Sequence, residues 1–351
     1  MEQNQWKQAL YLYVDGCNRR RVEPLVHGGG YPSGESGGRG PDAGLLSPQL
    51  SALEAERAAA LAEWYRERGI TPRRGETGVK VLHAAEAAGS VTAEVELHSA
   101  FYYEKGGATH REDRLERETL IFEPAGAGWR LRTVKRPVPE HLPFRLPEPV
   151  LAGGGLAADD AAAPRLPRPL LGRQVTGPDC VREVRYRREE AAAYADRWWN
   201  GGNPEYEFFE VDCTNYVSQC LFAGGAPFLY TGKRETGWWY KGRIGGQEWW
   251  SYSWAVSNSL RQYLEGERTQ GLRAELVARP EELQLGDCIL YDWDGDGRYQ
   301  HSTVVAAFDA GGMPLVNAHT VPSRHRYWDY RDSYAWTERT TYRFFHIADY
   351  L

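Results

Sequence analysis

Apolar side chains recur at helical spacing in four stretches of the chain. The first covers residues 3–14, and the second runs from Ser47, a good N-cap, to about residue 68, where Gly69 ends it. Residues 187–199 have apolar side chains three and four positions apart. The fourth stretch follows Asp212, and its apolar face consists of residues 213, 216, 217, 220 and 221. The pattern therefore predicts two helices in each half of the chain.

Other stretches have the spacing of strands. Apolar and polar residues alternate over 91–98, which is the period of a half-buried strand, and shorter apolar runs follow at 120–122 and 129–131. In the second half, apolar runs at 286–291, 301–306 and 314–319 indicate strands, the last two joined as a hairpin through 309–312. Helices followed by antiparallel strands predict an α+β fold for each half.

Two segments are poor in both patterns. Residues 27–44 contain eight glycines, which predicts a mobile loop, and residues 137–179 contain nine prolines. Because proline disrupts both helix interiors and strand pairing, we interpret 137–185 as a linker. The sequence thus predicts a smaller α+β domain at 1–136 and a second domain at 186–351. We find no chemical motif in the first domain, and its role stays open.

Composition narrows the class of protein. Of 351 residues, 42% are hydrophobic and 26% are charged, which is typical of globular chains. The net charge of -6 argues against nucleic-acid binding. Because there is no run of 18 apolar residues, we expect no membrane-spanning helix. The first residues lack a signal-peptide pattern, so the default location is the cytoplasm, or the exterior after release by another route. Oligomeric state cannot be predicted.

The five cysteines are sparse and form no CxxC pair, so they do not indicate a disulfide framework or a zinc ribbon. Cys213 follows the expected N-cap Asp212 and therefore falls in the first turn of a helix. There the helix dipole and the unpaired N–H groups favour a thiolate, and the same N–H groups could hold an oxyanion. The alternative is a small buried core residue, which is what we expect of Cys220 and Cys288.

A nucleophilic cysteine needs a base and a group that orients the base. His301 opens a predicted strand after a turn, where its ring could point into a cleft. Asn317, on the next strand, could lie across from His301 and fix the orientation of its ring. His319 lies two residues further on the same face, as a rival orienting group or a second polar wall.

The order of these segments is informative. Residues 212–221, 286–287, 292–303 and 316–320 together resemble the putative amidase domain family, which is similar to papain-like cysteine amidases and peptidases that act on bacterial cell walls. The resemblance covers about 186–347. It implies a papain-like fold, with a cysteine-bearing helix packed on an antiparallel sheet. It also implies that Cys213 is the nucleophile, His301 the base and Asn317 the third polar residue.

The resemblance further implies a peptide or a cell-wall-derived amide as substrate, plausibly a peptidoglycan stem peptide, with no cofactor. One departure from papain concerns the oxyanion hole. Glu207 stands where a papain-type enzyme has a glutamine six residues before the cysteine. The second oxyanion donor must come from elsewhere, and Asn200, Asn203 and Asn215 are candidates. We expect Asp212, Asn215 and His319 to line the substrate site.

Paired tryptophans provide a second candidate for substrate contact. Trp238 and Trp239 lie in a glycine-containing segment and could form a stacking rim for a glycan or peptide, together with the pairs at 198–199 and 249–250 and with Trp254. Core packing is the alternative for all of them.

Two metal sites also deserve a test. Asp292, Asp294 and Asp296, followed by Gly297, match the first half of a calcium loop, although position twelve is Thr303 and a tight solvated turn is the favoured alternative. A zinc site from His301, His319 and His325 lacks the helical HExxH spacing and leaves Cys213 unused. We therefore expect no bound metal.

Two classes of function remain open. The first is a cysteine-dependent hydrolase that cleaves amide or peptide bonds. The second is a non-catalytic module that binds peptide or glycan on a papain-like shell. The presence of Cys213, His301 and Asn317 in the chain favours the first class.

Overall fold

The computed structural model describes residues 5–23, 44–126, 128–144, 184–244 and 247–351. The predicted glycine-rich loop, apart from Gly44, and most of the predicted linker lie outside these residues, as does Cys180. The chain divides into two compact units. The first comprises 1–138 with the short segments 309–311 and 329–334, and the second comprises 139–308, 312–328 and 335–351.

Within its described residues, the first unit contains two long helices, α1 (Gln5–Val22) and α3 (Pro48–Arg68). The predicted ends of α3 are confirmed. Ser47 accepts a hydrogen bond from the Leu50 N–H at 3.3 Å, and Gly69 ends the helix with a φ of 64°. Helix α1 runs past the predicted end at residue 14, and Gly16 and Arg20 in the added part are buried.

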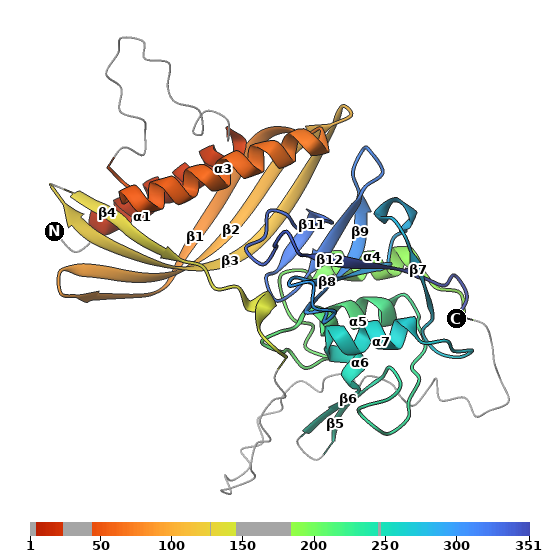
Figure 1. The fold of residues 1–351 in the computed structure, drawn as a ribbon. Coiled ribbons are helices and arrows are strands. Elements are labelled where there is room, and N and C mark those ends of the chain that lie inside the picture. Colours follow the sequence, from red (N-terminus) through yellow and green to blue (C-terminus); the bar gives the residue numbers. More distant parts are fainter. Residues whose placement is uncertain (1–4, 24–43, 127, 145–183, 245–246) are drawn as a thin grey trace, which may run out of the picture. The chain divides into compact units, whose positions relative to one another are not determined.

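Four strands form an antiparallel sheet in the first unit, in the order β1-β2-β3-β4 (Figure 1). They are β1 (Thr71–Ala87), β2 (Ser90–Lys105), β3 (Ala108–Ala125) and β4 (Gly128–Lys135). The strands predicted at 91–98, 120–122 and 129–131 are confirmed within β2, β3 and β4. Apolar residues of α1, β2, β3 and β4 share one core, which fixes this helix against the sheet.

The second unit contains a six-stranded antiparallel sheet in the order β11-β10-β9-β8-β12-β7. The strands are β7 (Ala274–Val277), β8 (Cys288–Asp292), β9 (His301–Phe308), β10 (Pro314–Ala318), β11 (Ser323–Tyr327) and β12 (Thr341–Ile347). A separate hairpin consists of β5 (Tyr240–Ile244) and β6 (Gln247–Trp250). The strands predicted at 286–291, 301–306 and 314–319 are confirmed as β8, β9 and β10.

Four α-helices accompany this sheet within the described residues: α4 (Arg188–Trp198), α5 (Cys213–Ala223), α6 (Tyr252–Ala255) and α7 (Ser257–Glu265). Short 3-10 turns occur at Pro139–His141 and Pro280–Glu282. Helices α4 and α5 correspond to the two helices predicted for this half. In the described part of the chain, no helix is long and apolar enough to cross a membrane.

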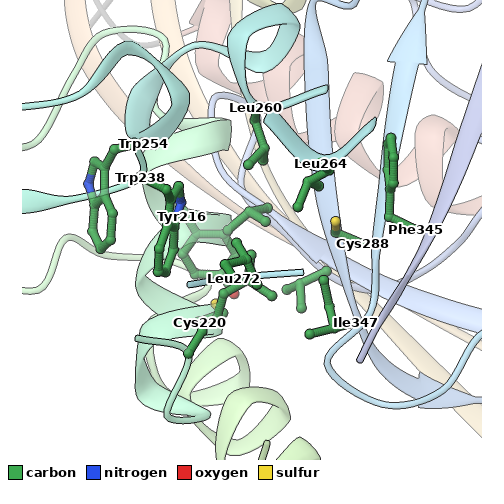
Figure 2. Close-up of a cluster of buried hydrophobic side chains, with 14 of the residues drawn as sticks. Tyr216, Cys220, Trp238, Trp254, Leu260, Leu264, Leu272, Cys288, Phe345 and Ile347 are labelled. Carbon is green, nitrogen blue, oxygen red and sulfur yellow. The ribbon is translucent and has the colours of Figure 1, made fainter. Parts of the chain in front are cut away.

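One face of the sheet packs against α5 and α7. Figure 2 shows Tyr216 and Cys220 from α5, Leu260 and Leu264 from α7, and Cys288 from β8 in one cluster with Phe345 and Ile347 from β12. All of them are buried, and Cys220 and Cys288 are core residues as expected. Both units are thus α+β with antiparallel sheets, which is the predicted class.

The turn before β8 is built around Asp287. Its buried carboxylate accepts hydrogen bonds from the Gln284 N–H at 2.7 Å and the Ile347 N–H at 2.9 Å, and it pairs with Arg188 and His346. Gly286, the residue before it, has a φ of 78°. This carboxylate ties α4, β8 and β12 together at one end of the sheet.

Candidate active site

Helix α5 begins at Cys213, so this residue stands in the first turn, as the sequence predicts. Its side chain is buried, with 2% exposed. The thiol Sγ lies 3.8 Å from the Gln300 carbonyl oxygen and 3.8 Å from the Thr214 Oγ1. Burial raises the pKa of the Cys213 thiol, and hydrogen bonds from Thr214 and from the backbone of Ser302 offset this only in part. Burial thus opposes the thiolate that the helix start is expected to favour.

Asp212 stands at the N-cap position but does not cap the helix with its side chain. Its φ of -106° and ψ of 0° lie outside the extended region from which a side chain reaches back to the first turn. Instead, Oδ1 accepts hydrogen bonds from the Phe209 N–H at 3.0 Å and from the Asn215 amide at 2.8 Å. The predicted capping role is wrong, and the carboxylate organises the loop before the helix.

The other oxygen of Asp212 faces His319. The distance from Asp212 Oδ2 to His319 Nδ1 is 2.6 Å, and His319 Nε2 lies 2.7 Å from the Trp198 carbonyl oxygen. Because a carbonyl oxygen only accepts, Nε2 carries a proton and donates it. The ring also stacks on Tyr216 at 3.9 Å between centroids. Both nitrogens of His319 are thus engaged, which suits a positioning role beside Cys213.

Thr320 contacts the backbone at Cys213, and this contact is not predicted from the sequence. Its Oγ1 accepts hydrogen bonds from the Asp212 N–H at 3.1 Å and from the Cys213 N–H at 3.2 Å. A signal was present, because Thr320 directly follows His319 in one of the segments that carry the family resemblance. The contact itself depends on the turn after β10 and could not be predicted from spacing.

His301 begins β9, and its ring packs against Tyr291 and Trp293, with centroids 5.5 Å and 5.6 Å away. Ser302, the next residue, has its hydroxyl 3.0 Å from that of Thr214 on α5. Since neighbouring side chains of a strand point to opposite faces, the His301 ring lies on the face away from α5. Burial, with a smaller contribution from the Arg326 charge, lowers the pKa of His301 to about 3.

Asn317 does not lie across from His301. The strands β9 and β10 pair from Phe308 with Pro314, and Asn317 is opposite Val304. Its amide donates to Asp196 Oδ1 at 2.9 Å, and its oxygen accepts from the His325 N–H at 2.7 Å. The expected orienting contact is therefore wrong. The turn lies where it is predicted, but pairing outward from Phe308 and Pro314 brings Val304, not His301, opposite Asn317.

The remaining predicted contact residues are structural in this arrangement. The Asn215 amide donates to the Glu207 carbonyl oxygen and to Asp212, and its oxygen accepts from the Trp254 indole at 2.7 Å. Trp238 and Trp239 are both 0% exposed. An exposed rim at this pair is thus a wrong prediction. Trp238 fills the core next to Trp254 and α5, and Trp239 is covered, with its ring centroid 5.0 Å from that of Tyr230.

The aspartate-rich loop has its own internal order. Asp292 Oδ1 accepts hydrogen bonds from the backbone N–H groups of Asp294, Gly295 and Asp296, and Oδ2 accepts from the Gly297 N–H at 2.8 Å. One buried carboxylate therefore supports the whole turn. Among the described residues, no three His, Cys, Asp or Glu side chains gather in a way that could hold a metal ion.

The three histidines considered for zinc have separate surroundings. His301 lies on the aromatic face of the sheet and His319 on Asp212, whereas His325 Nε2 is 2.9 Å from Asp196 Oδ1. Their rings do not converge on one point.

The comparisons with known proteins bear on the second unit. Residues 185–345 match the putative amidase domain family. This match confirms the predicted resemblance, and the family description indicates amide hydrolysis as the reaction class. The match excludes the sheet of β1 to β4, so it says nothing about the first unit.

Two proteins of Bacillus subtilis (strain 168) are similar to this chain, and both are named as uncharacterized. YhbB is 51% identical over 168 residues, which are 48% of this chain and 52% of its own. YjcM is 26% identical over 128 residues, which are 33% of this chain and 27% of its own. The chain thus spans about half of the first relative and about a quarter of the second. No solved structure matches.

Proposed function

We propose that the second unit hydrolyses amide bonds with Cys213 as nucleophile, on a papain-like arrangement of helix and sheet. One observation carries the proposal beyond the family match: the N–H groups of Asp212 and Cys213 converge on a single oxygen beside the thiol. Two converging backbone donors next to a nucleophile are what an oxyanion requires.

His301 is the proposed base. Its low pKa leaves the imidazole neutral near pH 7, but it also makes the ring a weak base in its buried position. His319 cannot accept a proton in this arrangement, because both its nitrogens are engaged with oxygens. Catalysis then requires the His301 side chain to leave the face of Tyr291 and Trp293 when substrate binds.

The reaction runs in two steps. His301 takes the thiol proton, and the sulfur of Cys213 forms a bond to the amide carbonyl carbon, whose π electrons move to the oxygen. The C–N bond then breaks, and His301 returns the proton to the leaving amine. Water attacks the resulting thioester, which releases the carboxylic acid and restores the thiol.

Peptides are the proposed substrates, and peptidoglycan stem peptides in particular, from the cell-wall amidases that the domain resembles. The surroundings of the site support a peptide. Phe208 is 60% exposed, and its ring centroid is 6.0 Å from that of His319. An exposed aromatic ring next to His319 can contact an apolar side chain of a bound peptide.

A second candidate is a non-catalytic peptide-binding module. The burial of the Cys213 thiol, the upward shift of its pKa and the position of the His301 ring on the other face of the sheet favour this alternative. The two candidates differ in whether Cys213 is needed for turnover.

The decisive experiment is a screen of muropeptides and small peptide amides with wild type, Cys213→Ala and Cys220→Ala. Cys220→Ala is the matched control, because it is the same substitution on the same face of α5. We expect Cys213→Ala to abolish release of amine while retaining the melting temperature, and Cys220→Ala to keep activity. A fully active Cys213→Ala variant would rule out the mechanism.

A further inference from the structure

The hydroxyl of Thr320 occupies an unusual position. It accepts two hydrogen bonds, from the N–H groups of the consecutive residues Asp212 and Cys213, at 3.1 Å and 3.2 Å. In the proposed mechanism these are the donors that face the carbonyl oxygen of the substrate. A hydroxyl oxygen and a substrate oxyanion cannot accept from the same two N–H groups at once. The resting site is therefore already filled by an oxygen of the protein itself.

The backbone at Thr320 is also unusual. Its φ of 76° lies in the left-handed region, which a β-branched residue rarely adopts because it strains the backbone. Such a conformation persists only where its surroundings hold it. Here the neighbouring His319 is held by Asp212 and by the Trp198 carbonyl oxygen.

The turn therefore has one anchored residue and one strained residue. Residues 319–322 connect β10 to β11, and they form a turn rather than part of either strand. Thr320 is half-buried beside Cys213, whose side chain is almost completely covered. Displacing Thr320 would release backbone strain and expose the thiol in the same movement.

We propose that the Thr320 hydroxyl holds the oxyanion position in the resting protein and that the carbonyl oxygen of the substrate replaces it. The inference rests on the proposed function for its account of the substrate, but the occupied position is independent of it. Thr320 is then a positioning residue. It keeps the two N–H groups aligned and hydrogen-bonded until substrate arrives, and it shields the thiol until then.

The test compares Thr320→Ser with Thr320→Ala, a matched pair that differs by one oxygen atom. Each full-length variant is treated with iodoacetamide at pH 7.5, and alkylation of every cysteine is followed by mass spectrometry. Cys220 and Cys288 are internal controls, because both are fully buried in the core. We expect Thr320→Ser to match wild type and Thr320→Ala to be alkylated at Cys213 at least several-fold faster.

Equal rates at Cys213 in the two variants would overturn the proposal. So would a parallel rise at Cys220 and Cys288, which would reflect general loosening. As a second measurement, a short peptide aldehyde should inhibit alkylation of Cys213 at lower concentration in Thr320→Ala than in Thr320→Ser, because its oxyanion has no hydroxyl to displace. Weaker protection in Thr320→Ala would mean that the hydroxyl assists the oxyanion, contrary to the proposal.

These outcomes distinguish a failure of the displaceable Thr320 hydroxyl from a failure of the amidase mechanism. A selective rise at Cys213 without any amide hydrolysis would support the displaceable hydroxyl and contradict the amidase mechanism. Hydrolysis that depends on Cys213, with equal alkylation in the two Thr320 variants, would support the mechanism and contradict the displaceable hydroxyl.

Discussion

Among single residues, the pair of Asp212 and His319 is the principal anchor beside Cys213. Both side chains are buried, and each has a second partner, so the pair connects the loop before α5 to the turn after β10. Breaking a buried pair by removing one member leaves the other uncompensated, which costs more than the pair contributes. The position of Thr320 depends on this pair.

We predict that Asp212→Ala lowers the free energy of unfolding by about 3–5 kcal/mol, because it leaves His319 and the Phe209 N–H without their acceptor. Urea unfolding of the variant would measure this loss. Glu281→Ala, at an exposed carboxylate of the same unit, is the control and should stay within about 0.5 kcal/mol of wild type. A loss below about 1 kcal/mol for Asp212→Ala would contradict the anchoring role.

The position of a residue in its helix or strand could be predicted from the sequence, whereas the contacts of its side chain could not. The pattern around Cys213 located a helix start correctly, because apolar spacing is a local property. The contacts of Asn317 and Thr320 depend on strand register and on a turn, which are set by packing across the sheet. The same limit applies to the Cys213 thiol, whose pKa follows from burial that a sequence does not reveal.

At the scale of elements, the turn that leads into β8 requires a glycine at position 286. The Tyr186 hydroxyl donates to the Gly286 carbonyl oxygen at 2.8 Å, and a Cβ at Gly286 would lie 2.7 Å from that hydroxyl. Gly297 has a similar positive φ, of 85°, but a Cβ there would meet nothing within 4 Å. Alanine substitutions at the two glycines therefore distinguish the cost of backbone strain from the cost of side-chain crowding.

We predict that Gly297→Ala costs about 1–2 kcal/mol, which is the backbone term alone, and that Gly286→Ala costs about 1–3 kcal/mol more. The additional cost arises because Tyr186 must move away from α4 and β8. Chemical denaturation of both variants gives the difference. Equal losses would show that Tyr186 yields without penalty.

A strand could be predicted from the sequence where one of its faces is buried and the other is exposed. Strand β2 alternates between buried and half-exposed positions over 91–98 and was predicted, whereas β1 was not. Most of β1 is exposed on both faces and contains Pro72, Gly75 and Gly78, so its side chains follow no period of two. Its strand conformation comes from pairing with β2 along its length.

At the scale of the whole molecule, His301 and His346 make the stability of the fold depend on pH. Burial lowers the pKa of His301 from 6.5 to about 3, so the unfolded chain binds one more proton than the folded chain between these values. This contribution to stability is therefore complete above pH 6.5 and is lost as the pH falls. His346 acts in the opposite sense, because its bond to Asp287 raises its pKa and stabilises the folded state at low pH.

We predict that replacing His301 with glutamine, which does not titrate, makes the stability of the second unit less dependent on pH. Between pH 6 and pH 4, wild type should lose about 1.4 kcal/mol per pH unit more than the variant. Urea unfolding at several pH values measures both slopes. Identical slopes would show that His301 is accessible to protons in the folded protein.

The match to the putative amidase domain covers the second unit, so the family accounts for less than the whole chain. The first unit has its own helices, sheet and core. Its α+β class could be predicted from periodicity, whereas its role could not, because no segment in it pairs reactive side chains at a spacing typical of catalysis.

The buried indoles around α5 give this protein a built-in optical probe. Trp238, Trp250 and Trp254 have no exposed surface or almost none, and they pack among aromatic rings of the second unit. Indoles in such an apolar and rigid setting emit at short wavelength and give strong near-ultraviolet circular dichroism, both of which disappear when specific packing is lost. Beside the signals of Trp6, Trp64 and Trp129 in the first unit, these rings will therefore report the integrity of the core that supports Cys213 without any added label.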